Sequence, residues 1–416
     1  PTGPLLYETQ LPLSLSGVDE MYRWINLRPG RSGDSRTGPS PNFPDDQSNG
    51  KHVVFVHGYN INEDQGHATA AEVFKRLYWS GSRAMFTAVT WQGDEQGGLL
   101  DSGAYYHLDV INAFEAASNL VPQVAALPGG SKYIMAHSLG NMLVSSAIRD
   151  HGLSVSNYFM IDAAVPIEAY SSIQLSMDEM YPPAWAGYST NLWASEWHRL
   201  WAFNPADGRN KLTWKNRFGD ILNAVNYYSS SEDVLQNNPP NPPDPESLVG
   251  LWKAGQHVWC FQEMIKGGPI PNILWGVDSH GGWGFNFFYQ KGGQPPDPNY
   301  VNGLSDETLR GDSVFKLFYD LNLHYSALGS ALATNLAVRA KLLAEAIPAV
   351  SRATGRNQVD NRFGTSANNK DLVEFKTAGM TWPRNDDRWR HSDFKEVAYS
   401  LNFGLYDDIR DRGGLK

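Results

Sequence analysis

The stretch SKYIMAHSLGNMLVSSAIRDHG (residues 131–152) decides the fold, because a short apolar run in it changes abruptly into a helical pattern. Residues 133–135 (Tyr-Ile-Met) have the length and apolar character of a buried parallel strand. From Leu139 onward, apolar side chains recur at spacings that fit one face of a helix. The sequence therefore predicts a strand, a sharp turn that contains Ser138, and a helix.

Small residues flank Ser138, with Ala136 two positions before it and Gly140 two positions after it. This small-x-Ser-x-small pattern is that of a nucleophile elbow, with Ala in place of the usual first Gly. Such a turn exposes the hydroxyl above the N-terminal end of a helix, where free N–H groups favour negative charge. A Ser after a strand can equally be an ordinary helix N-cap, so other segments have to decide between the two.

A second segment, KHVVFVHGYN (residues 51–60), has a β-branched strand that ends in His57 and Gly58. A strand ending in His-Gly, upstream of His-Ser-Leu-Gly, resembles the α/β-hydrolase family of lipases and esterases. The resemblance implies an α/β fold with a doubly wound, mostly parallel sheet and a large helical or irregular cap. It also implies an oxyanion hole made by the backbone amides of Tyr59 and Leu139, with His57 shaping the loop.

The rest of the chain alternates between strand-like and helix-like segments, which is typical of a doubly wound parallel sheet. An exposed-edge strand is expected near residues 11–15, and a surface loop rich in Pro, Gly and Ser over residues 29–50. Further strands are expected at 52–56, 84–91, 156–166 and 224–235, and helices at 68–80 and 105–127.

Two long insertions interrupt this alternation and carry nine of the 14 Trp residues. They are expected either to build an aromatic core for the cap or to form a lid over an apolar or sugar-stacking cleft. The predicted division is a core part at 1–166, a first cap insertion at 167–220, a core strand at 221–236, a second cap insertion at 237–380, and a final core part at 381–416.

The family resemblance implies the chain order Ser, acid, His for the catalytic residues. His391, in DDRWRHSDFKEVAY, lies near the end of the chain before an apparent helix, where this family carries its catalytic His. His280, in VDSHGGWGF, is the alternative base, although it lies in the middle of the second insertion.

Three carboxylates compete for the role of the acid. Glu232 follows the strand segment AVNYYSS (residues 224–230), directly before Asp233 and the aliphatic pair Val234-Leu235, and is the first choice. Asp233 is an alternative on the same loop. Asp162, in MIDAAVP, is the third candidate, because that segment resembles the one on which pancreatic-type lipases carry their acid.

Composition excludes several other classes of protein. The net charge of −10 argues against a nucleic-acid partner, and no run of about 20 uncharged apolar residues predicts a transmembrane segment. No metal site or cofactor motif is legible. The single Cys260 excludes an internal disulfide framework, and the start at Pro1 indicates a mature or trimmed chain. A bacterial exported protein is expected, with a cytoplasmic location as the alternative.

The sequence therefore predicts a serine hydrolase that cleaves a small-molecule or polymeric carboxylic ester through an acyl-enzyme, with Ser138, Glu232 and His391 as the triad. Polyesters, acylated sugars and amides are alternative substrates for the same triad. A binding module on an inactive hydrolase fold is the alternative from another class.

Overall fold

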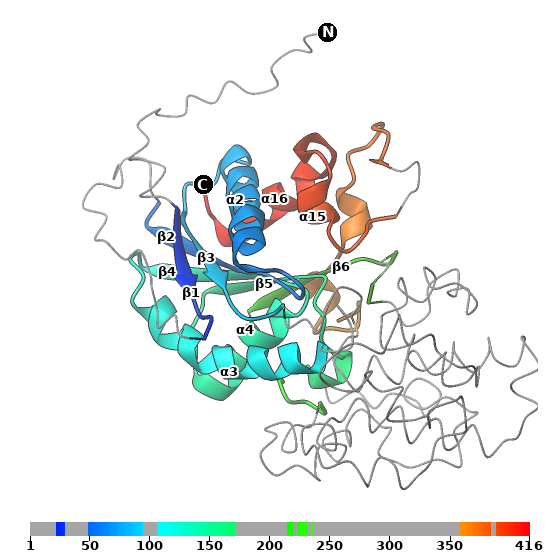
Figure 1. The fold of residues 1–416 in the computed structure, drawn as a ribbon. Coiled ribbons are helices and arrows are strands. Elements are labelled where there is room, and N and C mark those ends of the chain that lie inside the picture. Colours follow the sequence, from blue (N-terminus) through cyan, green and yellow to red (C-terminus); the bar gives the residue numbers. More distant parts are fainter. Residues whose placement is uncertain are drawn as a thin grey trace, which may run out of the picture.

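The computed structural model describes residues 22–29, 49–94, 106–170, 214–219, 221, 223–231, 234–235, 358–383 and 388–416. Within these residues the chain forms a seven-stranded sheet in the order β1-β3-β2-β4-β5-β6-β7, and each neighbouring pair is parallel (Figure 1). The strands are β1 (Tyr22–Asn26), β2 (Lys51–Val56), β3 (Met85–Thr90), β4 (Ser131–His137), β5 (Asn157–Ile161), β6 (Ala224–Tyr228) and β7 (Asn369–Asp371). This confirms the predicted α/β class and the doubly wound parallel sheet.

Helices cover both faces of the sheet. One face carries α3 (Tyr106–Ala125) and α4 (Gly140–His151), and the other carries α2 (Glu63–Trp79), α15 (Asp393–Glu396) and α16 (Tyr399–Gly413) (Figure 1). Because both faces are covered, the central strands are buried throughout, with all of β3 and most of β2 and β4 out of solvent. This is why those strands read as continuous apolar runs in the sequence.

The order of the strands creates a switch point between β2 and β4. The two strands are neighbours, but the chain continues from β2 to β3 on one side and from β4 to β5 on the other. Loops that leave the two strand ends therefore diverge, and in open parallel sheets the crevice for ligands lies at such a point. The predicted Ser138 and the His57-Gly58 pair follow these two strands.

Four elements differ clearly from the sequence-based expectation. Strands β5 and β6 are five residues each, shorter than the expected ranges 156–166 and 224–235. Strand β7 lies inside the range 237–380 that was assigned to the second insertion, so the sheet resumes before residue 381. It was missed because Asn-Lys-Asp at the sheet edge is polar and half-buried, with no apolar alternation. Helix α2 begins at Glu63 rather than at residue 68, because Asn62 and Gln65 form a capping box at its N-terminus.

Much of both insertions and the expected strand at 11–15 lie outside the described residues. Trp214 is the described Trp of the first insertion; it is buried and packs on Phe114 of α3, with ring centroids 6.2 Å apart. Among the helices of the described part of the chain, none is long and apolar enough to cross a membrane.

Candidate active site

Ser138 occupies the turn between β4 and α4 with a φ of 52°. A positive φ is rare for a residue with a side chain and costs about 1–2 kcal/mol, and such strain clusters at functional sites. The backbone of Ser138 is fixed on both sides: its N–H donates to Ile161 O at 3.0 Å, and its carbonyl accepts from the N–H groups of Asn141 and Ala164 at 3.1 Å. The strained turn is therefore tied to the end of β5.

Two glycines allow this turn to form. A Cβ on Gly140 would lie 2.4 Å from His57 O, and a Cβ on Gly58 would lie 2.7 Å from the Cβ of Ser138. The loop after β2 thus packs directly against the turn after β4. As a consequence Ser138 is only 4% exposed, and the elbow pattern was wrong in predicting an exposed residue.

A buried amide that the sequence analysis did not select braces the same turn. The side chain of Asn141, one residue into α4, donates to the carbonyls of Ala136 at 3.1 Å and Ser138 at 3.0 Å. Its own Oδ1 accepts from the hydroxyl of Tyr158 in β5 at 2.8 Å. The sequence does contain a signal for this role of Asn141: a polar residue follows the Ser138 turn at the start of a helix that is otherwise largely apolar there.

His57 shapes the loop after β2, as the resemblance implied. Its Nε2 accepts from the Trp91 backbone N–H at 3.3 Å, so Nδ1 carries the hydrogen and donates to Gly58 O at 2.8 Å. Burial lowers the pKa of His57 to about 4, which keeps the ring neutral in this one tautomer. Tyr59, one of the two predicted oxyanion donors, follows Gly58 on the same loop. The other, Leu139, is buried and precedes α4 directly.

The segment around His391 lies beside the Ser138 turn. His137, the residue before Ser138, donates from Nε2 to His391 O at 2.9 Å, and the two imidazole rings are 4.6 Å apart between centroids. Burial, and secondarily the electrostatic effect of the neighbouring His391 ring, hold the pKa of His137 well below its usual value, so the His137 ring is neutral. The structure therefore brings His391 next to the strand end that carries Ser138.

The loop after β6 reaches the same segment. Ser229 donates from Oγ to Trp389 O at 2.7 Å, and the Trp389 N–H donates to Ser231 Oγ at 2.8 Å. Glu232 and Asp233 lie outside the described residues, but Ser231 directly precedes them and is bonded two residues away from His391.

Asp162, the third candidate acid, lies at the end of β5. It is fully buried with a φ of 40°, and its N–H donates to Tyr227 O at 2.9 Å. Its Oδ1 accepts from Gln358 Nε2 at 2.8 Å. This carboxylate is thus directed toward the segment that precedes β7. His280, the alternative base, lies outside the described residues.

Comparison with known proteins found one family match and similar solved structures. Residues 42–167 match the family described as "Alpha/beta hydrolase of unknown function (DUF900)", a range that contains β2, β3, β4 and the Ser138 turn. A crystal structure of a PytH variant is similar at 19% identity with a TM-score of 0.21; the similarity covers 30% of this chain and 47% of that one. No curated protein matches the sequence.

The matched range ends shortly after β5, and the sheet continues beyond it through β6 and β7 in the same parallel order. Residues 42–167 thus match an α/β-hydrolase family, and the seven-stranded parallel sheet with helices on both faces is consistent with an α/β-hydrolase fold.

Proposed function

We propose that the protein is a serine hydrolase that cleaves carboxylic esters through an acyl-enzyme. The observation that carries the proposal is the position of Ser138: a non-glycine residue at positive φ, between a strand and a helix, at the switch point of a parallel sheet. The His391 segment is bonded to the residue just before it. A strained Ser beside a His is the arrangement that nucleophilic catalysis requires.

In the proposed mechanism His391 accepts the proton of the Ser138 hydroxyl as that oxygen attacks the ester carbonyl. The negative charge that develops on the carbonyl oxygen is stabilised by the backbone N–H groups of Tyr59 and Leu139. The alcohol leaves with the proton from His391, and a water molecule activated by the same imidazole then releases the acid.

Glu232 is proposed as the acid that orients His391, with Asp233 as the alternative on the same loop. The loop that carries Glu232 is supported by two hydrogen bonds near His391: Ser229 Oγ donates to Trp389 O, and the Trp389 N–H donates to Ser231 Oγ. The carboxylate of Asp162 accepts from Gln358 Nε2. A carboxylate in this place fixes the tautomer of the imidazole and stabilises the imidazolium that forms.

The test is labelling by a fluorophosphonate probe together with hydrolysis of neutral nitrophenyl esters. The parent should be labelled once per chain, whereas Ser138→Ala should not be labelled and should lose turnover by orders of magnitude. Ser146→Ala is the matched control, because Ser146 is a buried serine of α4, the helix that follows the turn, and its hydroxyl donates to Asp150.

Each outcome separates the candidate functions. Labelling of the parent and not of Ser138→Ala supports the serine hydrolase. A parent that is never labelled would support a binding module on a hydrolase fold. Labelling without turnover of any nitrophenyl ester would keep the nucleophile and place the substrate among polyesters, acylated sugars or amides.

A further inference from the structure

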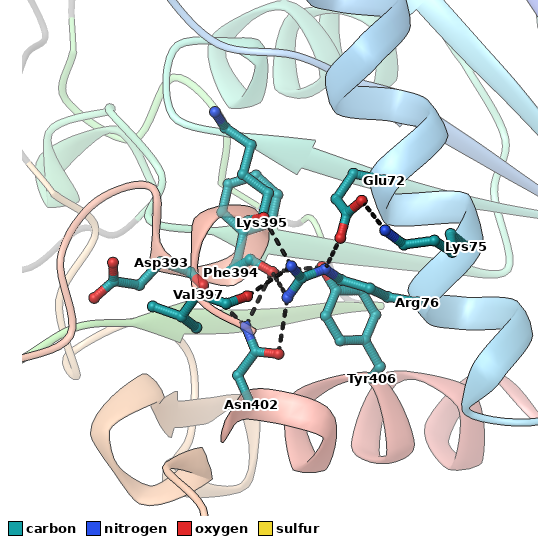
Figure 2. Close-up of polar contacts among 9 residues, drawn as sticks. All are labelled: Glu72, Lys75, Arg76, Asp393, Phe394, Lys395, Val397, Asn402 and Tyr406. Carbon is teal, nitrogen blue, oxygen red and sulfur yellow. Dashed lines mark hydrogen bonds and ion pairs between the residues drawn. The ribbon is translucent and has the colours of Figure 1, made fainter. Parts of the chain in front are cut away.

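Arg76 of α2 is buried and uses all five N–H donors of its guanidinium. Its side chain is only 3% exposed, and one of its acceptors is charged (Figure 2). The acceptors are Glu72 Oε1 at 2.8 Å from Nε, Phe394 O at 3.1 Å and Asn402 Oδ1 at 2.9 Å from Nη1, and Lys395 O at 2.8 Å and Val397 O at 2.7 Å from Nη2. Five donors meeting five acceptors is the full capacity of an Arg side chain.

Three of these acceptors are backbone carbonyls at the C-terminal end of α15. The last carbonyls of a helix have no partner within it, and a one-turn helix such as Asp393–Glu396 cannot satisfy them by extension. The guanidinium satisfies them instead, and its positive charge suits the negative end of the helix. Neighbouring groups complete the cluster: Asn402 Nδ2 donates to the carbonyls of Asp393 and Phe394, and the Tyr406 hydroxyl donates to Phe394 O (Figure 2).

The helix that Arg76 holds is the continuation of the His391 turn. Helix α15 begins two residues after His391, and the turn is closed by Asp393: its N–H donates to Arg390 O and its Oδ2 accepts from the Arg390 N–H, both at 2.9 Å. The ring of Phe394 packs on His137 with centroids 4.5 Å apart, and His137 donates to His391 O. A shift of α15 would therefore move His391 relative to the Ser138 turn.

We propose that Arg76 is a positioning residue that holds His391 in line with Ser138 by fixing α15 from the opposite helix. The inference rests on the proposed function, because it assigns Arg76 a role in the reaction only if His391 is the base. Arg76 touches neither the substrate nor the reacting atoms; it acts through the backbone of α15.

Arg76→Lys is the informative substitution. A lysine keeps the positive charge and the long apolar stem, but it has three donors and no planar fork, so at least two of the five acceptors lose their partner. Glu72→Gln is the matched control. It removes the negative charge beside Arg76 at a side chain that is 27% exposed, and it leaves the four hydrogen bonds from Arg76 to the α15 segment and Asn402 in place.

Four quantities are measured on the full chain well below its melting temperature: kcat and KM for a nitrophenyl ester, the rate of fluorophosphonate labelling, and hydrogen exchange of the amides at 390–397. Arg76→Lys should lower kcat and the labelling rate by roughly tenfold to a hundredfold with KM little changed, since a displacement of about 1 Å has this effect. Exchange at 390–397 should rise by roughly tenfold. Glu72→Gln should stay within about twofold of the parent, because a partly exposed ion pair contributes little.

If Arg76→Lys matches Glu72→Gln in kcat and in exchange, the inference is overturned. It is also overturned if exchange rises while kcat and labelling stay at the parent value, because the role would then be structural only. Should Arg76→Lys not fold, Tyr406→Phe removes one hydrogen bond to Phe394 O, keeps the ring, and gives the same readouts with a smaller change. A parent that is neither labelled nor active overturns the proposed function and this inference together, whereas an active parent with an unaffected Arg76→Lys overturns the inference alone.

Discussion

Replacing Gly140 by Ala should damage both the stability and the activity of the protein. The added Cβ would lie 2.4 Å from His57 O and 2.8 Å from Val56 O, whereas a Cβ essentially never comes closer than 3.0 Å to another atom and ordinary contacts begin at 3.4 Å. The two carbonyls belong to the backbone at the end of β2, so a rotamer change cannot relieve the clash. The end of β2 and the Ser138 turn would have to separate by roughly 0.6–1.0 Å, which is the difference between the 2.4 Å contact and a contact of 3.0–3.4 Å.

The magnitude follows from two opposing effects. Overpacking of this kind costs about 1–3 kcal/mol, and rigid backbone on both sides favours the upper end. Ala regains at most about 1 kcal/mol over Gly inside a helix. The net destabilisation is therefore about 2 kcal/mol, which corresponds to a fall of about 4–8 °C in melting temperature at 2–4 °C per kcal/mol. The same displacement moves the Gly58 loop away from Ser138, so kcat for a nitrophenyl ester should fall by roughly tenfold to a hundredfold.

Gly130→Ala is the control, because Gly130 follows α3 in a turn where a Cβ meets no atom within 4 Å. Its free energy of unfolding should stay within about 0.5 kcal/mol of the parent. Thermal melts followed by circular dichroism, with ester hydrolysis on the same samples, give both quantities. Equal melting temperatures and equal kcat for the Gly140 and Gly130 variants would refute the close approach of β2 to the Ser138 turn.

Three further predictions, on five substitutions, test other parts of the molecule. Among Glu232→Gln, Asp233→Asn and Asp162→Asn, the first should lose about four decades in kcat, and a loss confined to the Asp162 variant would place the acid after β5. Burial lowers the pKa of His52 in the folded protein to about 3, whereas the value in the unfolded chain is near 6.5. Between these two pH values the unfolded chain binds a proton at His52 that the folded protein does not bind. The free energy of unfolding therefore falls as the pH drops from about 6.5 toward 3. His52→Gln should remove about 1.4 kcal/mol per pH unit of that slope in urea titrations between pH 6 and 4.5; an unchanged slope would contradict the buried neutral ring. Asn141→Ala should cost about 1–3 kcal/mol in the same urea titrations, because it removes the side-chain hydrogen bonds to the Ala136 and Ser138 carbonyls, and a loss near zero would count against this role of Asn141.

The pattern of apolar residues in the sequence predicts best those strands that are buried on both faces along their length. Strands β2 and β3 are covered on both faces, so burial demands an unbroken apolar run, and the run is visible in the sequence. Strand β7 is a three-residue edge strand that is held by backbone pairing with β6. Its sequence, Asn-Lys-Asp, has no apolar residue that would predict a strand.

The contacts that brace the candidate site are less accessible to sequence reasoning. The Ser138 turn was predicted from small neighbours, because a sharp reversal restricts side-chain size locally. Arg76 was not selected, because its acceptors at Phe394 and Asn402 lie 318 and 326 residues further along the chain. In the sequence, a buried Arg on an amphipathic helix cannot be distinguished from an exposed one, because its burial depends on a helix that is distant along the chain.

This long separation has a consequence for how the protein is made. Helix α2 leaves the ribosome more than 300 residues before α15, a delay of roughly 15–65 s at 5–20 residues per second. Throughout that interval the carbonyls of α15 that accept from the Arg76 guanidinium do not yet exist, and the guanidinium has to remain hydrated. The face of α2 that carries Arg76 therefore stays in contact with water. Closure of that layer is thus deferred until the segment that forms α15 and α16 has been translated.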